Sequence, residues 1–482
     1  MTGHGERGGG GRSRPAMKLL NDQPLAWDGR RYTLASPDTL GRDELAGQIA
    51  DVIRVVDPPF TVAVYGTWGE GKTHLLKSVE NQVRGFQDDP DHPGRPAFQT
   101  VWFDLWQHQH DDKPTLALLQ AAVRAVRYDA AGHEQADWPG IWDKVAQVGK
   151  ALLWTLGDMV TPKLALGATG ATLSASVSDK GLVSAFKDNW EALAEAGMQV
   201  RDEQARLQEL FRDALDALAG EAKIAFFVDD LDRCLPTTTI ELLEQIKLFM
   251  DHPRCVFVLG VDARAVTEAV RTVKGYTDDI AEHYLEKMIQ CAFDLPPVAD
   301  EANRRFIEDA LSRAANPSSR PGRPDVTAGQ LDLLTGGQVT AIADLWLPAF
   351  RDADVDATPR LIVRTVNTFL VDHAVGRGAV TDRQGNRRPR IPGYDPRVMA
   401  ALAPLKTCYR AAFDYLRRHH DDRPGLLESL LSTYDGDPLD ATVREIVFQG
   451  QGRRYIDHVR SRIEAAGLVI DRELAEAYCK LS

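Results

Sequence analysis

Residues 61–76, TVAVYGTWGEGKTHLL, constrain the fold more than any other stretch of the chain. The first five of these residues are β-branched or apolar, which indicates a buried strand, and an apolar helical pattern follows Thr73. Between the strand and the helix lies the spacing GxxxxGKT, which begins at Gly66. A strand, a glycine loop and a helix in this order are typical of a phosphate-binding loop. The stretch therefore predicts an α/β fold with a nucleotide site.

Each type of residue in this loop has a chemical role in binding phosphate. The glycines let the backbone turn so that its N–H groups face phosphate oxygens at the positive end of the following helix. Lys72 would supply a cation to the β- and γ-phosphates, and the Thr73 hydroxyl would ligate Mg²⁺. A chance glycine-rich turn is the alternative, but the flanking strand and helix argue against it. The predicted nucleotide-binding residues of the loop are Gly66, Thr67, Trp68, Gly69, Glu70, Gly71, Lys72, Thr73 and His74.

A second run, KIAFFVDDLDRC at residues 223–234, indicates phosphate chemistry as well. Its continuous apolar part is typical of a central parallel strand. Asp229 and Asp230 follow at the carboxyl end, where ligands bind in open α/β sheets. Asp229 would hold Mg²⁺, directly or through water, and Asp230 would orient or deprotonate the attacking water. A helix N-cap would also explain one aspartate, but with the catalytic Lys72 upstream the pair completes one mechanism.

The next residues leave more than one role open. Asp232 and Arg233 have two possible roles. Either they form a local ion pair that braces the loop, or Arg233 faces the nucleotide or a neighbouring subunit. A strand over residues 254–261 ends at Asp262, which is placed to contact the γ-phosphate or to cap a helix. The chain has no NKxD guanine motif, so ATP is favoured over GTP. Further strands are predicted at residues 99–105 and 290–295.

Length and charge limit the possible functions. The 482 residues, 44% hydrophobic and 26% charged, indicate a globular protein of about two to four domains. A net charge of −13 argues against a surface that binds polyanions throughout, but not against a local basic face. Five scattered cysteines without a CxxC pair indicate a reducing, cytosolic compartment. The Gly- and Arg-rich start lacks an apolar h-region, so we expect a disordered leader and no signal peptide.

Residues 145–185 raise the question of membrane attachment. Much of this segment is weakly charged and rich in Gly, Ala, Thr and Ser. A membrane-spanning helix needs about 20 mainly apolar residues, and Asp158, Pro162 and Lys163 interrupt the run. We therefore expect a helical hairpin or a segment at a membrane surface, and no transmembrane helix. The expected localisation is cytoplasmic, with peripheral membrane attachment as the alternative.

Residues 377–397 carry six arginines against two aspartates. Such a segment would suit nucleic-acid phosphates, but no aromatic platform interleaves with it, so a solvated loop is favoured. The helical pattern from residue 398 onward would serve as a lid or as a surface for a protein partner or a second copy of the chain. Nucleic acid is the less favoured partner.

Several motifs together resemble the KAP family of P-loop NTPases. They include GTWGEGKT with Trp68 inside the loop, FDLW at residues 103–106 and FFVDDLDRCLP at residues 226–236. Further matches are VLGVD at 258–262, YLEKMIQCAFDLP at 284–296 and TPRLIVRTVN at 358–367. The resemblance spans about residues 20–370, and the DDLDRC run is its most specific part.

This resemblance implies ATP and Mg²⁺ as ligands and an ASCE-type sheet in which the acidic strand lies beside the P-loop strand. It also implies that Arg360 and Arg364, on a helix after the core, are sensor arginines; a solvated basic face is the alternative. Many family members carry transmembrane helices between the P-loop and the acidic strand, where this chain has a more polar insert. Bacterial members include phage-exclusion proteins, and the Ala-, Arg- and Asp-rich composition favours that branch.

We therefore predict an ASCE-type P-loop NTPase with a parallel sheet, helices on both faces, a helical insert and a helical C-terminal region. The predicted activity is ATP hydrolysis that switches the arrangement of the helical parts. The alternatives are a nucleic-acid motor or loader and a scaffold that binds ATP without turnover. The predicted regions are a leader (1–18), an ATPase core (19–113 and 221–300), a helical insert (114–220), a helical sensor or lid region (301–376), a basic loop (377–397) and a C-terminal helical region (398–482).

Overall fold

The computed structural model of the chain divides into two compact units. The predicted leader, residues 145–185 and almost all of the predicted insert lie outside the described residues. The described residues are 19–20, 25–27, 32–34, 38–85, 98–110, 117–118, 121–122, 124–125, 212, 215–216, 222–249, 252–315, 334–352, 358–381, 387–391, 393–410, 413–414, 452–468, 474 and 477–478.

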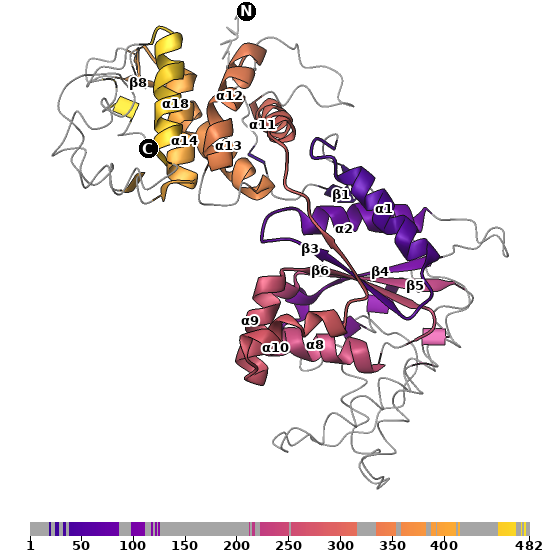
Figure 1. The fold of residues 1–482 in the computed structure, drawn as a ribbon. Helices are drawn as coiled ribbons and strands as arrows, with labels where there is room; N and C mark the ends of the chain where they lie inside the picture. The colour runs from indigo at the N-terminus through magenta and orange to yellow at the C-terminus, as the bar shows by residue number, and fades with distance from the viewer. Residues whose placement is uncertain are drawn as a thin grey trace, which may run out of the picture. The chain divides into compact units, whose positions relative to one another are not determined.

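A parallel sheet of five strands forms the centre of the first unit (Figure 1). Its order is β4-β5-β6-β3-β7, and every neighbouring pair is parallel. Each strand coincides with a strand predicted from the sequence, apart from one or two residues at the ends. The predicted parallel α/β fold class is therefore confirmed. The strands are β3 (Phe60–Tyr65), β4 (Phe98–Asp104), β5 (Lys223–Asp229), β6 (Cys255–Val261) and β7 (Cys291–Asp294).

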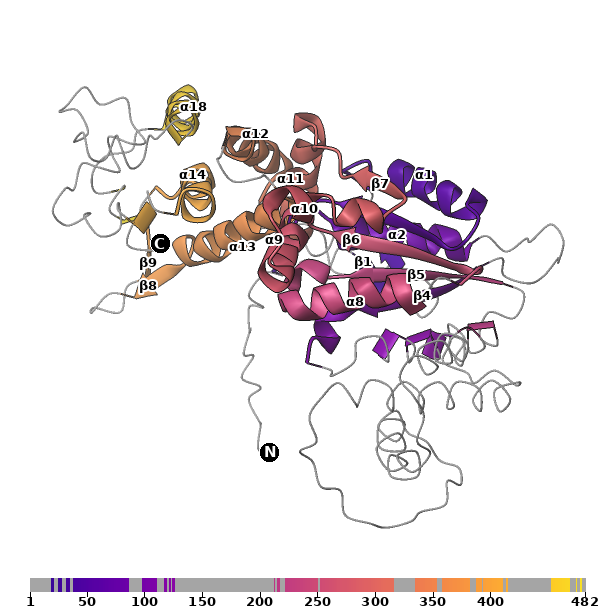
Figure 2. The same cartoon turned by 60° about the horizontal axis from the view of Figure 1, so that its bottom comes forward.

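The expected neighbourhood of the acidic strand was wrong. The resemblance implied that β5 lies beside the P-loop strand β3, but β6 lies between them, with β7 beyond β3 and β4 beyond β5. Figure 2 shows β4, β5 and β6 side by side. The register pairs Tyr65 with Val261 across β3 and β6, and Leu259 with Val228 across β6 and β5. The order of strands along a chain does not fix their order across a sheet, because a helical crossover can reach beyond the nearest position.

Helices cover both faces of this sheet, as predicted (Figure 1). Side chains alternate along β3, so that Val62 and Val64 pack against one pair of helices while Ala63 faces the other pair. Two apolar cores result, one on each face, and they hold the strand ends in fixed positions. The first pair is α1 (Arg42–Val55) and α2 (Lys72–Arg84), and the second is α8 (Pro236–Phe249) and α9 (Ala263–Lys274).

Short elements complete this unit. An antiparallel hairpin near the start pairs Leu25 with Leu34 and was not foreseen, because three-residue strands leave no clear alternation in the sequence. Two turns of 3-10 helix follow the carboxyl ends of β4 and β5. The elements are β1 (Leu25–Trp27), β2 (Tyr32–Leu34), η1 (Leu105–His108), η2 (Leu231–Arg233), α10 (Asp278–Glu282) and η3 (Leu285–Lys287).

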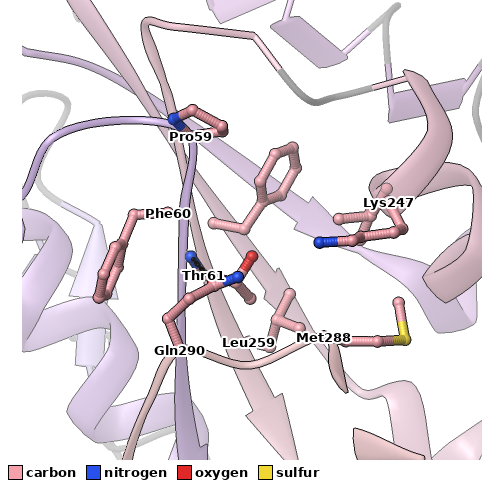
Figure 3. A pocket seen from close by; sticks show the side chains of 9 residues that line it. Pro59, Phe60, Thr61, Lys247, Leu259, Met288 and Gln290 are labelled. Atoms are coloured by element: carbon pink, nitrogen blue, oxygen red, sulfur yellow. Dashed lines mark hydrogen bonds between the residues drawn. The ribbon is translucent and has the colours of Figure 1, made fainter. Parts of the chain in front are cut away.

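A small pocket opens at the start of β3, with a volume of about 80 Å³ (Figure 3). Phe60, Phe257 and Met288 contribute to its lining, and the Lys247 side chain reaches toward it. The backbone N–H of Thr61, also in the lining, donates to the Gln290 side chain over 2.7 Å. Because the P-loop follows the other end of β3, this pocket lies at the sheet edge opposite the phosphate-binding loop.

The second unit is mainly helical. Its core centres on Trp346, whose indole N–H donates to the Ala400 carbonyl over 2.7 Å. The Tyr455 hydroxyl donates to the neighbouring Ala401 carbonyl over 2.9 Å, so two aromatic residues fix the same helix. The helices are α11 (Asp300–Ala315), α12 (Gly336–Asp352), α13 (Pro359–Gly376), α14 (Pro396–Thr407) and α18 (Gly452–Ala465).

The segment predicted as a basic loop contains a short hairpin. β8 (Ala379–Thr381) pairs antiparallel with β9 (Arg387–Pro389). The high arginine content led to the prediction of a solvated loop, whereas Val380 and Thr381 have the β-branched side chains that favour a strand.

No helix among the described residues is long and apolar enough to cross a bilayer.

Candidate functional site

The P-loop begins where β3 ends. The Gly66 N–H donates to the Val261 carbonyl over 3.2 Å, which ties the start of the loop to β6. A Cβ atom at Gly66 would stand 2.6 Å from Leu295 Cδ1, so no larger residue fits without displacing that side chain. Gly69 and Gly71 have φ angles of 92° and 106°, values that side chains other than glycine rarely adopt.

Gly71 is also the N-cap of α2, so the amino end of this helix opens directly onto the loop. The Glu70 carboxylate accepts the Thr67 N–H over 2.6 Å, and this hydrogen bond within the loop stabilises its conformation. The Thr67 hydroxyl is buried and has no hydrogen-bond partner among the described residues. Trp68, by contrast, is 65% exposed. The loop thus combines a helix N-terminus with turned backbone amides, the arrangement that binds phosphate in proteins.

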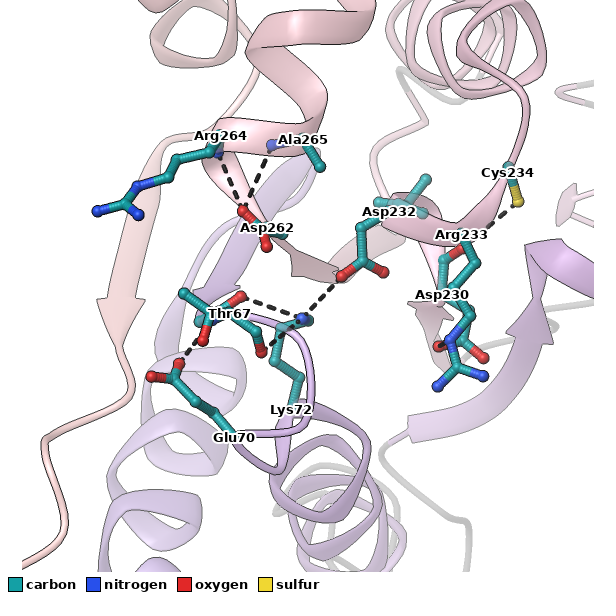
Figure 4. Close-up of polar contacts among 12 residues, drawn as sticks. Thr67, Glu70, Lys72, Asp230, Asp232, Arg233, Cys234, Asp262, Arg264 and Ala265 are labelled. Atoms are coloured by element: carbon teal, nitrogen blue, oxygen red, sulfur yellow. Dashed lines mark hydrogen bonds and ion pairs between the residues drawn. The ribbon is translucent and has the colours of Figure 1, made fainter. Parts of the chain in front are cut away.

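Lys72 reaches back across the loop (Figure 4). Its ammonium group donates to the carbonyls of Gly66, over 3.0 Å, and of Thr67, over 3.2 Å. It also forms a 2.9 Å ion pair with Asp232. The side chain is thereby held over the loop at the carboxyl edge of the sheet.

Asp229 lies at the end of β5 and is 2% exposed. Its Oδ1 atom has no hydrogen-bond partner among the described residues. Burial raises the pKa of Asp229, and a hydrogen bond from the Thr73 hydroxyl acts against that rise. The structure therefore brings together the two residues that the sequence singled out as Mg²⁺ ligands, Thr73 and Asp229.

Asp230 follows in a left-handed backbone conformation with φ 58° and starts the η2 turn. Its carboxylate forms a 2.8 Å ion pair with Arg233 Nε. Burial and the charge of Asp229 raise the pKa of Asp230 to about 7, although Arg233 opposes the rise. The Arg233 guanidinium also lies 5.9 Å from the centre of the Trp68 ring, so it links the acidic turn to the P-loop.

The remaining predicted site residues are placed as follows. Asp262 caps α9, where its carboxylate accepts the N–H groups of Arg264 over 3.1 Å and Ala265 over 3.4 Å (Figure 4). Its contact with the γ-phosphate stays a prediction. Arg360 and Arg364 lie on α13 of the second unit, after the N-cap Thr358, and their sensor role also stays a prediction. His74 lies half-buried in the first turn of α2.

Three residues near this edge were not singled out for the site. Asp104, at the end of β4, stands directly beside Asp229 in the sheet register. Gly260 on β6 leaves room for Asp229, because a Cβ there would lie 3.0 Å from Asp229 Oδ1. Asp232 contacts Lys72, and Arg233 contacts Asp230, so the structure does not show the local ion pair between Asp232 and Arg233 that was one alternative for this turn. Two of the three gave a signal in the sequence, because Asp104 stands at a predicted strand end and Asp232 lies in the DDLDRC run. The contacts of Gly260 and Asp232 depend on the order of the strands.

A parallel sheet with a glycine loop after one strand and an acidic pair after another defines a P-loop NTPase domain, whose fold implies nucleotide binding. The comparison with known families identifies it more closely. The KAP family P-loop domain matches residues 42–375, well over half of the chain. The chain therefore belongs to the KAP family.

Two relatives are similar over different lengths. The phage T7 exclusion protein of Escherichia coli (strain K12) is 23% identical over 318 residues, which cover 64% of this chain and 38% of that protein. The kinase D-interacting substrate of 220 kDa of Rattus norvegicus is 34% identical over 67 residues, 14% of this chain and 4% of that protein. The chain thus matches less than half the length of either relative.

Among solved structures, the Aeropyrum pernix ORC2 protein in its ADPNP–ADP complexes aligns with a TM-score of 0.37 and 12% identity. The alignment covers 92% of this chain and 95% of that one. A similarity at this level supports no inference about the function of the chain.

Proposed function

We propose that the chain binds ATP with Mg²⁺ and hydrolyses the bond between its β- and γ-phosphates. The observation that carries this proposal is the meeting of Lys72, Thr73, Asp229 and Asp230 at one edge of the sheet. They come from two segments about 150 residues apart in the sequence, and the Thr73 hydroxyl contacts the Asp229 carboxylate. Membership of the KAP family supports nucleotide binding.

Mg²⁺ fits the donors present. The cation prefers hard oxygen ligands and is bound in such sites by one or two protein groups together with phosphate oxygens and water. The Thr73 hydroxyl and the buried Asp229 Oδ1, which has no hydrogen-bond partner among the described residues, are donors of this kind. Thr73 and Asp229 would hold the ion, which would neutralise charge on the phosphate oxygens.

The residues of the chain would then act mainly by position and charge. The N–H groups of the loop and the amino end of α2 would bind phosphate oxygens, and Lys72 would bridge the β- and γ-phosphates. Asp230 would orient the attacking water or accept its proton. Arg233 holds the Asp230 carboxylate over 2.8 Å and would keep it aimed at that water. Asp262 is a proposed contact to the γ-phosphate, and Arg360 and Arg364 are proposed sensor arginines that reach the nucleotide.

We further propose that turnover switches a protein partner or a second copy of the chain, and that the role is defence against phage. The similarity to the phage T7 exclusion protein supports the second point. Nucleic acid as a partner and a membrane surface at residues 145–185 remain alternatives. Both are decided by adding DNA or anionic vesicles to the assay below.

The test is steady-state ATP hydrolysis by the purified chain and by Asp230→Asn, with equilibrium binding of ATP measured in parallel. We expect turnover in the wild type, and loss of turnover with retained binding in Asp230→Asn. Lys72→Ala should lose binding as well. Binding of ATP without turnover in the wild type would contradict hydrolysis and leave a nucleotide-binding scaffold.

A further inference from the structure

The ion pair between Lys72 and Asp232 joins two segments that lie 160 residues apart in the sequence. Lys72 belongs to the P-loop, and Asp232 lies in the η2 turn after the acidic pair (Figure 4). The two charged atoms are 2.9 Å apart, and each side chain is only 7% exposed. At such low exposure an ion pair is little screened by salt and strongly constrains both partners.

The hydrogen bonds of Lys72 account for its whole donor capacity. An ammonium group has three N–H donors, and three protein oxygens accept from this one: the carbonyls of Gly66 and Thr67 and the Asp232 carboxylate. A phosphate oxygen that binds Lys72 must therefore take the place of one of these acceptors. Asp232 is the one of the three that carries a negative charge.

The three acceptors of Lys72 differ in how easily they can move away from it. The two carbonyls are part of the loop, and Gly66 is also tied to β6 through its own N–H. The η2 turn is anchored by the buried Leu231, whose carbonyl accepts the Thr239 hydroxyl over 2.9 Å. Asp232 needs only a side-chain rotation to leave Lys72. It is thus the acceptor that phosphate displaces at the lowest cost.

On the basis of the proposed function, we propose that Asp232 is a residue of the nucleotide site that competes with phosphate for Lys72. A carboxylate and a phosphate are both anions, so they attract the same ammonium and repel each other. Asp232 therefore weakens the affinity of the site for nucleoside di- and triphosphates and favours release of the product.

The neighbouring residue extends the consequence. Arg233 follows Asp232 in η2, pairs with the Asp230 carboxylate and lies near the Trp68 ring of the P-loop. The η2 turn therefore contacts the P-loop through both residues. Displacement of Asp232 by phosphate removes one of these contacts. Phosphate bound to Lys72 therefore changes the contacts of the turn that Asp230 starts.

A purely structural role for the ion pair makes the opposite prediction. If Asp232 only braced the P-loop in its binding conformation, removal of its charge would loosen the loop and weaken nucleotide binding. If Asp232 competes with phosphate, the same change strengthens binding. The direction of the change in affinity separates the two roles.

The experiment measures the Kd of a fluorescent ADP analogue for the full chain and its variants. Asp232→Asn keeps the size of the side chain and removes the charge; we expect the Kd to fall about tenfold, the effect of one charge-assisted hydrogen bond. Asp232→Glu restores a carboxylate and should bind nearly as the wild type does. Glu244→Gln is the matched control, because Glu244 forms its 2.6 Å ion pair with Lys274 on the α8–α9 side of the sheet.

The outcomes separate the inference from the function on which it rests. Wild-type binding with equal or weaker binding by Asp232→Asn would overturn the inference and leave the nucleotide site intact. An absence of binding in the wild type and in Asp232→Asn would overturn both. Asp232→Ala provides a second uncharged variant, and thermal unfolding of each variant shows whether it is folded at the temperature of the titration.

Discussion

The Asp229 carboxylate lies against the backbone of Gly260, where a Cβ atom would stand 3.0 Å from Asp229 Oδ1. A Cβ atom at Gly260 would also lie 2.8 Å from Leu76 Cδ1 on α2. Gly260 belongs to β6, the strand between the acidic strand and the P-loop strand. The acidic residue therefore owes its position to the absence of a side chain on the neighbouring strand.

Gly260→Ala should disturb both Asp229 and the packing of α2. Overpacking of a tight core costs about 1–3 kcal/mol, so we expect a loss of stability of that size together with a decrease in ATP turnover. Urea unfolding and a steady-state assay measure the two effects. Gly336→Ala is the control, since a Cβ there meets nothing within 4 Å, and its stability should change by less than about 1 kcal/mol. Equal behaviour of the two variants would contradict the tight contact.

Removal of the Thr73 hydroxyl should weaken the affinity of the site for Mg²⁺. Thr73→Ala loses the proposed Mg²⁺ ligand and the hydrogen bond to Asp229, so the Mg²⁺ concentration for half-maximal turnover should rise by about tenfold or more. Thr73→Ser keeps the hydroxyl and should resemble the wild type. EDTA should abolish turnover, and added Mg²⁺ should restore it. Wild-type metal dependence in Thr73→Ala would exclude this residue as a ligand.

His252 should make folding stability depend on pH. Its ring is 1% exposed, Nδ1 accepts the Arg254 N–H over 3.2 Å, and Nε2 lies 3.3 Å from Asp216. Burial lowers the pKa of His252, and the charges of Arg212 and Arg254 lower it further, whereas Asp216 opposes them. The folded state therefore favours the neutral ring, while the unfolded chain takes up a proton below about pH 6.5.

The sign follows from this difference. The contribution of His252 to stability is present above about pH 6.5 and is lost as the pH falls toward the lowered folded-state pKa, with a slope of at most about 1.4 kcal/mol per pH unit. Urea unfolding at several pH values between 5.5 and 7.5 measures the slope. His252→Gln should reduce it, although His458, whose pKa burial also lowers, would keep part of it. An unchanged slope in His252→Gln would assign the pH dependence to other groups.

The local parts of the site could be predicted from the sequence because their signals are local. The alternation before Gly66, the GKT at the start of α2 and the apolar run before Asp229 each determine an element within a few residues. The phosphate-binding loop and the acidic pair then lie close together because the carboxyl ends of parallel strands share one edge of the sheet.

The contacts between distant segments could not be predicted in this way. The partner of Lys72 is 160 residues away, and the room that Gly260 leaves for Asp229 depends on β6 lying beside β5. Asp262 illustrates a different limit, because a carboxylate at a strand end serves equally well as a helix cap and as a ligand. Its residue type alone does not separate the two roles.

Asn367, the last residue of the TPRLIVRTVN motif, clasps the backbone of Leu20 within the second unit. Its Nδ2 donates to the Leu20 carbonyl over 2.7 Å, and its Oδ1 accepts the Leu20 N–H over 2.8 Å. Leu20 itself packs against the helical core. Asn367→Ala removes both hydrogen bonds and should lower the free energy of unfolding by about 1–3 kcal/mol, as measured in urea. Thr368→Ala is the control, because its hydroxyl donates, among the described residues, only to the Arg364 carbonyl of the same helix, and alanine is the better helix former. Equal stability of the two variants would show that the clasp on Leu20 contributes nothing to the fold.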